Sequence, residues 1–291
     1  MEYLILRFLC AALTGVILSQ TGSLIQMSTR NILASPSTLG FDGLSILWIL
    51  IFHSILIMAG TEQGTAFVFL SGIPVFMVVG WLFSRFIARH KNIEKLIFMG
   101  LTFNLLVGTI FSLWQFLFLA FNFPFPVELW FGHFRYSNET SLLILGMIEG
   151  LTLILWLFLK KEFAVFSLGQ SVAVNLNLKK GFLYLYIFST IAIGTFAVIA
   201  LFGAFSFLGL VFPIIARKLW FNRFDLNGEF ILGALVNGLF LLFIDGLCYF
   251  FPIYGAEVPV GLIATGVGAL SLILLLWKSD SRLELLAKME K

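Results

Sequence analysis

Long runs of apolar residues, separated by short polar segments, constrain this chain more than any other feature of its sequence. Of its 291 residues, 60% are hydrophobic and only 11% are charged. A run of about 18 apolar residues or more is long enough to cross a bilayer as an α-helix. The sequence therefore predicts an all-α polytopic membrane protein with about nine spans, the seventh short and broken by Gly and Pro. We place them at residues 5–27, 41–59, 65–84, 95–120, 141–160, 181–200, 203–219, 228–250 and 258–278.

The basic residues predict the orientation of these spans. Loops on the cytoplasmic side of membrane proteins carry an excess of Lys and Arg. If the N-terminus lies outside, all but Arg7 and Arg135 of the 18 Lys and Arg residues fall on the cytoplasmic side. We therefore expect the N-terminus outside, the C-terminus in the cytoplasm, and membrane lipid around the spans. The net charge of +3 is too small to indicate a nucleic-acid partner.

A few polar residues interrupt the predicted spans. Glu149 and Asp245 lie mid-span, and Gln26 and Asn104 are milder cases. A charge at the bilayer centre costs about 2.5–3.5 kcal/mol on insertion scales, so such residues need a reason to be there. Two alternatives stay open: these groups line a water-filled path, or they hydrogen-bond one helix to another, with protonated acids as one form of this alternative.

Metal and catalytic motifs are lacking in the sequence. The two cysteines lie in apolar runs, the three histidines are scattered, and there is no C-x-x-C motif. No Gly-Lys dipeptide occurs, so a Walker A nucleotide loop cannot be built, and neither H-E-x-x-H nor G-x-S-x-G occurs. We expect no catalytic residue, no metal and no cofactor in this chain. Energy for any transport would come from another subunit or from an ion gradient.

The polar stretch between the first two spans reads "GSLIQMSTRNILASPSTLG", residues 22–40. Pro36 cannot continue a helix, and the residue before a proline is pushed away from helical geometry. Asn31 and Ser35 can hydrogen-bond the backbone groups that the helix end leaves free. From composition alone, this is an ordinary turn or an adjustable joint at a cytoplasmic gate.

This stretch resembles the G-x-x-x-Q-x(3)-R-N-P-L-A-x-P-x-x-L-G signature of the FecCD-type permeases, the membrane subunits of ABC importers for iron-siderophore, haem and cobalamin. Three later segments are similar to further family motifs, in the family's order: "SLGQSVAVNLNL", "GAFSFLGLVFPIIAR" and "IDGLCYFFPIYGAEVPVGLIATGVGA". Some family residues are replaced: Ile32 and Ile214 stand for Pro and His, Gln170 for an acid, and Tyr249 for an Arg.

The resemblance implies the family's ten-helix permease fold lacking its first helix, with an inverted-repeat arrangement. It implies one transmembrane permease domain over residues 1–291 of a bacterial cytoplasmic (inner) membrane protein. A cytoplasmic coupling loop is expected at about 160–180, as two short amphipathic segments separated by Gly169. The residues expected to contact the ATPase are Leu168, Gly169, Gln170, Ala173 and Leu176.

The function implied by the resemblance is import of a metal chelate, most commonly a ferric siderophore in this family, with haem or cobalamin as other cargo. The implied partners are ABC ATPase subunits, an extracytoplasmic substrate-binding protein, and a second permease, identical or paralogous. Arg7 and Arg135 are expected to dock the binding protein. The residues expected at the gate or along the path are Gln26, Arg30, Asn31, Pro36, Gly40, Glu149, Gly209, Pro213, Asp245, Pro259 and Gly261.

Two rival interpretations remain. One is an ion-coupled secondary transporter that uses Glu149 and Asp245. The other is a divergent or impaired copy of the family, because the first helix and several signature residues are missing.

Overall fold

The computed structural model describes residues 2–59, 65–89, 93–121, 129–168, 180–219, 226–253 and 255–289. Across these ranges the chain forms nine α-helices and no strand. They are α1 (Glu2–Thr29), α2 (Phe41–Ala59), α3 (Thr65–Arg89), α4 (Ile93–Ala120), α5 (Glu139–Leu168), α7 (Lys180–Phe202), α8 (Leu208–Leu219), α9 (Leu226–Phe250) and α10 (Val260–Met289).

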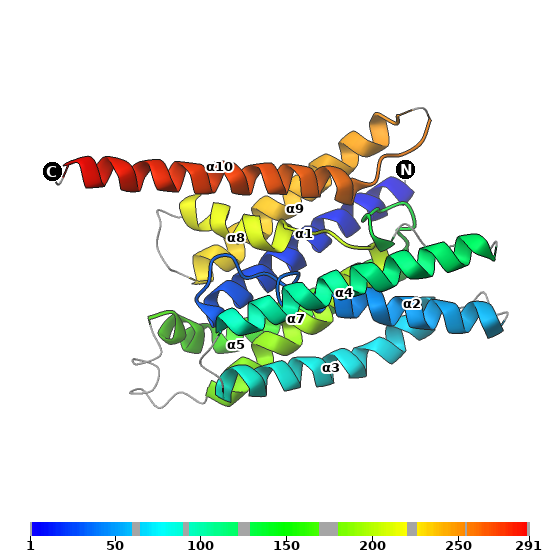
Figure 1. The fold of residues 1–291 in the computed structure, drawn as a ribbon, viewed down its shortest axis with the longest axis horizontal. Helices are drawn as coiled ribbons and strands as arrows, with labels where there is room; N and C mark the ends of the chain where they lie inside the picture. The colour runs from blue at the N-terminus through cyan, green and yellow to red at the C-terminus, as the bar shows by residue number, and fades with distance from the viewer. Residues whose placement is uncertain are drawn as a thin grey trace.

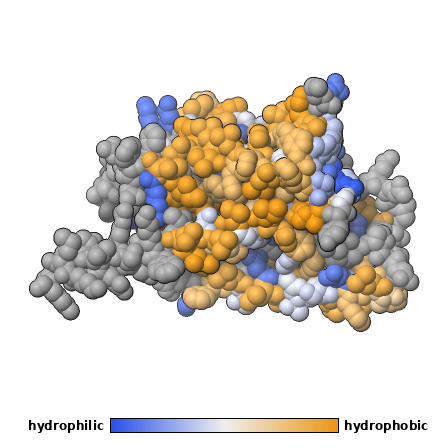
Figure 2. Space-filling view, turned by 90° about the horizontal axis from the view of Figure 1, so that it is seen from above, coloured by the Kyte–Doolittle hydropathy of each residue, from blue (hydrophilic) through white to orange (hydrophobic). Residues whose placement is uncertain are grey.

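The helices form one elongated bundle with N- and C-termini toward opposite ends (Figure 1). Six of them are long and apolar enough to cross a membrane, and α2 and α10 contribute shorter apolar stretches at Phe41–Leu56 and Val260–Leu274. Apolar residues cover the middle of the face seen in Figure 2, and hydrophilic residues lie mostly toward its two ends. This is the surface that a membrane-spanning bundle presents to lipid.

The seventh predicted span, 203–219, is only partly helical, in agreement with the Gly and Pro residues that break it. Gly203 and Phe207 both have positive φ, 85° and 67°, and α8 begins only at Leu208. With 12 residues, α8 is about 18 Å long at 1.5 Å per residue, short of a hydrocarbon core of about 30 Å. The chain returns first as an extended segment and then as α8 (Figure 1), so the termini still lie at opposite ends.

Helix α1 lies inside the bundle, in contact with α5, α7, α8 and α9. Two of its glycines bring neighbouring backbones close: a Cβ on Gly15 would lie 2.5 Å from the carbonyl oxygen of Asn237, and one on Gly22 only 1.7 Å from that of Gly209. Lipid tails are as apolar as leucine, so membrane helices associate through such close contacts and through hydrogen bonds. Small residues thus set where α8 and α9 cross α1.

Aromatic side chains fill the contact between α3 and α7. The rings of Phe76 and Phe196 stack with centroids 4.3 Å apart, and Phe69 stacks on the same ring at 5.9 Å. A Cβ on Gly72 would lie 2.0 Å from Phe196, so glycine leaves the space that this ring occupies. The α3–α7 contact therefore depends on ring packing rather than on polar groups.

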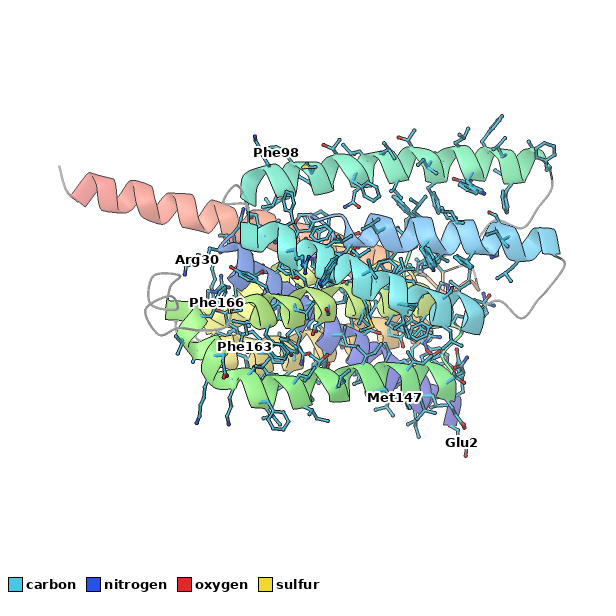
Figure 3. The ribbon with its side chains drawn as sticks, turned by 90° about the horizontal axis from the view of Figure 1, so that it is seen from below. Glu2, Arg30, Phe98, Met147, Phe163 and Phe166 are labelled. Atoms are coloured by element: carbon cyan, nitrogen blue, oxygen red, sulfur yellow. The ribbon has the colours of Figure 1, made fainter. Side chains whose placement is uncertain are left out.

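The coupling loop was expected to begin at about residue 160, but α5 continues to Leu168. Phe163 and Phe166 are buried, and their rings contact Tyr186 and Tyr184 of α7 at 5.6 and 5.5 Å between centroids. Packing of these rings stabilises the extra turns of helix. Figure 3 shows both residues at the end of the bundle that carries Arg30, opposite Glu2.

The outer surface of the bundle is apolar on several helices. Phe98 of α4 and Met147 of α5 are 70% and 71% exposed, and both lie at the edge of the bundle in Figure 3. Side chains of this kind suit contact with lipid or with another membrane helix.

Candidate functional site

Polar and charged groups meet α1 at three levels of the bundle, and the first lies near its N-terminal end. The Arg7 guanidinium donates from Nε to both carboxylate oxygens of Asp245, at 3.0 and 2.9 Å, and from Nη2 to Asp245 Oδ1 at 2.8 Å. Its Nη1 donates to Glu257 Oε2 at 2.8 Å. The guanidinium also lies over the ring of Tyr249, 4.9 Å from its centroid. One cation therefore connects α1, α9 and the segment before α10.

This cluster changes the interpretation of Asp245 and Arg7. Asp245 lies one turn and a half from the end of α9, not mid-span, and neither side chain is more than 1% exposed. A docking residue has to reach the surface, whereas Arg7 is occupied within the chain, so its docking role stays a prediction that this geometry does not favour. Tyr249, which replaces an Arg of the family motif, gives the guanidinium an aromatic face instead of a second positive charge.

A small cavity opens beside this cluster. Its volume is about 120 Å³, and both Arg7 and the exposed Arg135 line it, together with Phe131, His133 and residues 257–260. The backbone of Arg135 accepts a hydrogen bond from Tyr3 at 2.7 Å. Arg135 is thus the more accessible of the two arginines expected to dock a partner, and that role stays a prediction.

Pro259 lines this cavity, and Gly261 packs against the loop that contains Gly132. The Gly261 amide donates to the Gly132 carbonyl at 2.7 Å, and a Cβ on Gly261 would lie 2.5 Å from the Gly132 nitrogen. The extended segment after α7 joins the same loop through Ala204, which bonds Leu129 and Gly132 at 3.0 Å each. Gly261 therefore has a packing role in this structure.

The second level lies about a third of the way along α5, at Glu149. Gln20 Nε2 of α1 donates to Glu149 Oε1 at 2.8 Å, and both side chains are buried. Of the two alternatives for Glu149, the structure shows a hydrogen bond between helices.

The third level lies at the opposite end of α1. Arg217 of α8 donates from Nε and Nη2 to the two carboxylate oxygens of Glu229 of α9, at 2.6 and 2.8 Å. Its Nη2 also reaches Gln26 Oε1 at 3.3 Å, while Gln26 Nε2 donates to the Leu210 carbonyl at 2.9 Å. Gln26, expected at the gate, thus joins α1 to α8.

Gly209 and Pro213 position α8 against α1. A Cβ on Gly209 would lie 3.0 Å from the Leu18 carbonyl oxygen and 3.2 Å from the Pro36 ring. Pro213 lies within α8 and is buried. These residues pack in the protein interior, and a place on a transport path stays a prediction for both.

The turn after α1 is fixed by hydrogen bonds within the turn and to Asn104 of α4. Arg30 is exposed with a φ of 51°, the Asn31 side chain accepts from the Leu33 amide at 2.8 Å, and Gly40 has a φ of 87°. Asn104 of α4 accepts from the Gly43 amide at 3.0 Å and also donates to the Ser37 carbonyl. These contacts fit a firmly packed turn.

Most of the residues expected to contact an ATPase fall beyond what the structure describes. Leu168 is the last residue of α5. Gly169, Gln170, Ala173 and Leu176 lie outside the described residues, so their contact with an ATPase stays a prediction.

Sequence reasoning missed the partners in these clusters: Gln20, Glu229, and the ion pairing of Arg7 with Asp245 and Glu257. A charged residue inside a membrane needs an opposite charge at the same depth. Matching acids to bases by their distance from helix ends would have paired Arg7 with Asp245, and Arg217 with Glu229.

Comparison with known proteins gives a consistent result across the chain. The family model described as the FecCD transport family matches residues 1–278. The hemin transport system permease protein HmuU of Yersinia pestis is 26% identical over 273 residues, 90% of this chain and 78% of that protein. The petrobactin import system permease protein FatD of Bacillus anthracis is 27% identical over 274 residues, 93% of this chain and 78% of that protein.

A solved structure has a similar fold. It is a metal-chelate type ABC transporter in an inward-facing conformation, with a TM-score of 0.75 and 22% identity, and the match covers 94% of this chain and 85% of that one. At this identity the match concerns the fold alone.

Proposed function

This chain belongs to the FecCD transport family, and from that membership we propose that it is the permease subunit of an ABC importer for a metal chelate. The observation that carries the proposal is the extent of the family match, which runs through all the described helices as far as residue 278 in α10. The all-helical fold and its apolar surface agree with a membrane subunit.

The proposed cargo is a ferric siderophore, with haem or cobalamin as alternatives within the same class. The relatives support the class of cargo: one is named for hemin transport and another for petrobactin import. Uptake assays that compare these chelates directly test the proposed cargo.

The proposed partners follow from the architecture of such an importer. Two cytoplasmic ATPases would contact the segment after α5, a binding protein would deliver the chelate outside, and a second permease would complete the path. ATP binding can shift the permease from one conformation to another only if the ATPase binds these two conformations with different affinity. Within such a mechanism, the end of α5, packed on α7 through Phe163 and Phe166, would carry that movement into the bundle.

The proposed orientation places the N-terminus outside and the turn at Arg30 in the cytoplasm, in a bacterial inner membrane. Figure 3 supports this proposal, because Arg30 lies at the same end as Phe163 and Phe166, near the segment expected to meet the ATPase.

Geometry weakens the rival of an ion-coupled carrier. That mechanism needs Asp245 and Glu149 to exchange an ion, but Asp245 is bound to Arg7 by three hydrogen bonds and Glu149 is held by Gln20.

Purification of the tagged protein from its native membranes in mild detergent, followed by mass spectrometry of the co-purifying proteins, tests the importer. The wild type is compared with Gly169→Pro, in the segment proposed to contact the ATPase. Gly181→Ala is the matched control, because a Cβ there would meet nothing within 4 Å. We expect an ABC ATPase with the wild type and the control, and its loss with Gly169→Pro.

Two other outcomes would revise the proposal. An ATPase retained by Gly169→Pro would contradict the proposed coupling segment while leaving the importer in place. Absence of any ATPase, under conditions that preserve another importer from the same membranes, would contradict the importer itself. Uptake of labelled ferric siderophore and haem, with and without a proton uncoupler, would then show whether an ion gradient drives transport.

A further inference from the structure

Glu149 and Gln20 form a hydrogen bond deep within the bundle that satisfies only half of their polar atoms. Glu149 is 6% exposed and Gln20 is 2% exposed. The Gln20 amide nitrogen donates to Glu149 Oε1 at 2.8 Å. The other two atoms, Glu149 Oε2 and Gln20 Oε1, are fully buried and have no hydrogen-bond partner.

An ionised Glu149 cannot provide a hydrogen-bond partner for these two buried oxygen atoms. A carboxylate oxygen and an amide carbonyl oxygen are both acceptors only, so neither can bond the other. Buried polar atoms are nearly always hydrogen-bonded, and a buried charge needs a partner of opposite charge. An ionised Glu149 would leave two bare acceptors and a negative charge in the interior.

The helices packed around α5 supply no such partner among the residues that the structure describes. On α7, the Tyr186 hydroxyl faces α5 and donates to the Thr152 carbonyl at 3.0 Å. On α9, Glu229 is bound to Arg217 and Asp245 to Arg7. Gln20 is thus the polar group of α1 that meets Glu149, and it carries no charge.

We propose that Glu149 carries a proton on Oε2 and forms a reciprocal acid–amide pair with Gln20. The proton comes from water, and the new O–H donates to Gln20 Oε1 while the amide N–H continues to donate to Glu149 Oε1. Each group is planar with two polar atoms on one carbon, so the two hydrogen bonds can lie side by side. One proton removes the charge and satisfies both bare acceptors.

This pair would act as a neutral connection between α5 and α1. Hydrogen bonds and close packing hold membrane helices together where no hydrophobic drive exists between them. The proposal goes beyond the proposed transport function and does not depend on the cargo. It assigns Glu149 to helix association, in place of the ion-carrying role that the sequence left open.

Infrared spectroscopy of the protein in lipid nanodiscs at neutral pH tests the proton directly. A protonated carboxyl group has a carbonyl band that a carboxylate lacks, and this band moves to lower frequency in D2O. Glu149→Gln keeps an amide that can hydrogen-bond Gln20. We expect its spectrum to lack one protonated-carboxyl band that the wild-type spectrum contains. Glu139→Gln, at an exposed acid in the first turn of the same helix, is the control and should leave the band unchanged.

A second variant tests the partner. Gln20→Met removes both hydrogen bonds, so the Glu149 band should move to higher frequency. If Glu149→Gln loses no such band, the proposal that Glu149 is protonated is overturned. A band that is lost there but unmoved by a folded Gln20→Met variant would overturn the reciprocal pair. If Gln20→Met does not fold, ¹⁵N labelling of glutamine amides in the wild type supplies the same test, since the pair predicts a ¹⁵N-sensitive band that Glu149→Gln alters.

Discussion

At the scale of single residues, the position of Arg7 shows how a guanidinium is kept inside a membrane bundle. Two carboxylates and an aromatic face surround it, and the side chain of Asp245 is fully buried. Bidentate contact between Arg and a carboxylate satisfies several donors at once. The cluster has two acids for one cation, and Glu257, 31% exposed, keeps contact with the cavity beside it.

Removing one member of this cluster tests its role. Arg7→Met would leave the Asp245 carboxylate buried without its cation, and breaking a buried ion pair this way typically costs about 3–5 kcal/mol. We expect a correspondingly lower thermal unfolding midpoint in detergent. Arg135→Met, at an exposed arginine, should change the stability by no more than about 0.5 kcal/mol. If the double variant Arg7→Met/Asp245→Leu recovers part of the stability lost in Arg7→Met, the pairing is confirmed. Equal effects of Arg7→Met and Arg135→Met on the unfolding midpoint would contradict it.

At the scale of helices, α1 is placed by glycine contacts and by hydrogen bonds at its crossings. The Gly22–Gly209 contact brings the backbones of α1 and α8 together, and Gln26 crosses the same interface to the Leu210 carbonyl. Because α8 is short, its position depends on this contact and on the Arg217–Glu229 ion pair with α9.

Substitution of Gly22 measures how closely α1 and α8 approach. The Cβ of Gly22→Ala would lie 1.7 Å from the Gly209 carbonyl oxygen, so the two backbones must separate. Overpacking of this kind typically costs about 1–3 kcal/mol, and a backbone contact cannot relax by rotating a side chain. Gly181→Ala, with open space around it, should be neutral or stabilising by up to about 1 kcal/mol through helix propensity. The measurement is the thermal unfolding midpoint of both variants and of the wild type. A Gly22→Ala midpoint equal to that of the wild type would contradict the close approach of α1 and α8.

The sequence was sufficient to predict most helices, and physical reasons explain where it was not. Apolar runs located the long helices, because a span needs a minimum apolar length whatever its neighbours are. The extended segment before α8 depends on positive φ values at Gly203 and Phe207 and on bonds to residues 129–133, which are distant in sequence. The polar partners of Arg7, Gln20 and Arg217 likewise lie on other helices, so tertiary packing alone reveals them.

At the scale of the whole molecule, polar contacts connect α1 to its neighbours at three depths. Arg7 joins it to α9 at one end, Gln20 joins it to α5 in the middle, and Gln26 joins it to α8 at the other end. In contrast, the α3–α7 contact is filled by aromatic rings. Each end of the group formed by α1, α8 and α9 thus has its own ion pair.

The orientation of this bundle in the membrane can be tested with cysteine labelling in intact cells. The native Cys10 and Cys248 are buried, so the wild type should react little with a membrane-impermeant maleimide. Tyr136→Cys and Leu33→Cys place thiols at two exposed positions, 58% and 43% exposed, toward opposite ends of the bundle. Because the predicted topology puts nearly all basic residues on the side of Leu33, the positive-inside rule predicts labelling of Tyr136→Cys from outside. Leu33→Cys should react only after the membrane is permeabilised. The reverse pattern would invert the proposed topology and place the segment proposed to contact the ATPase outside the cell.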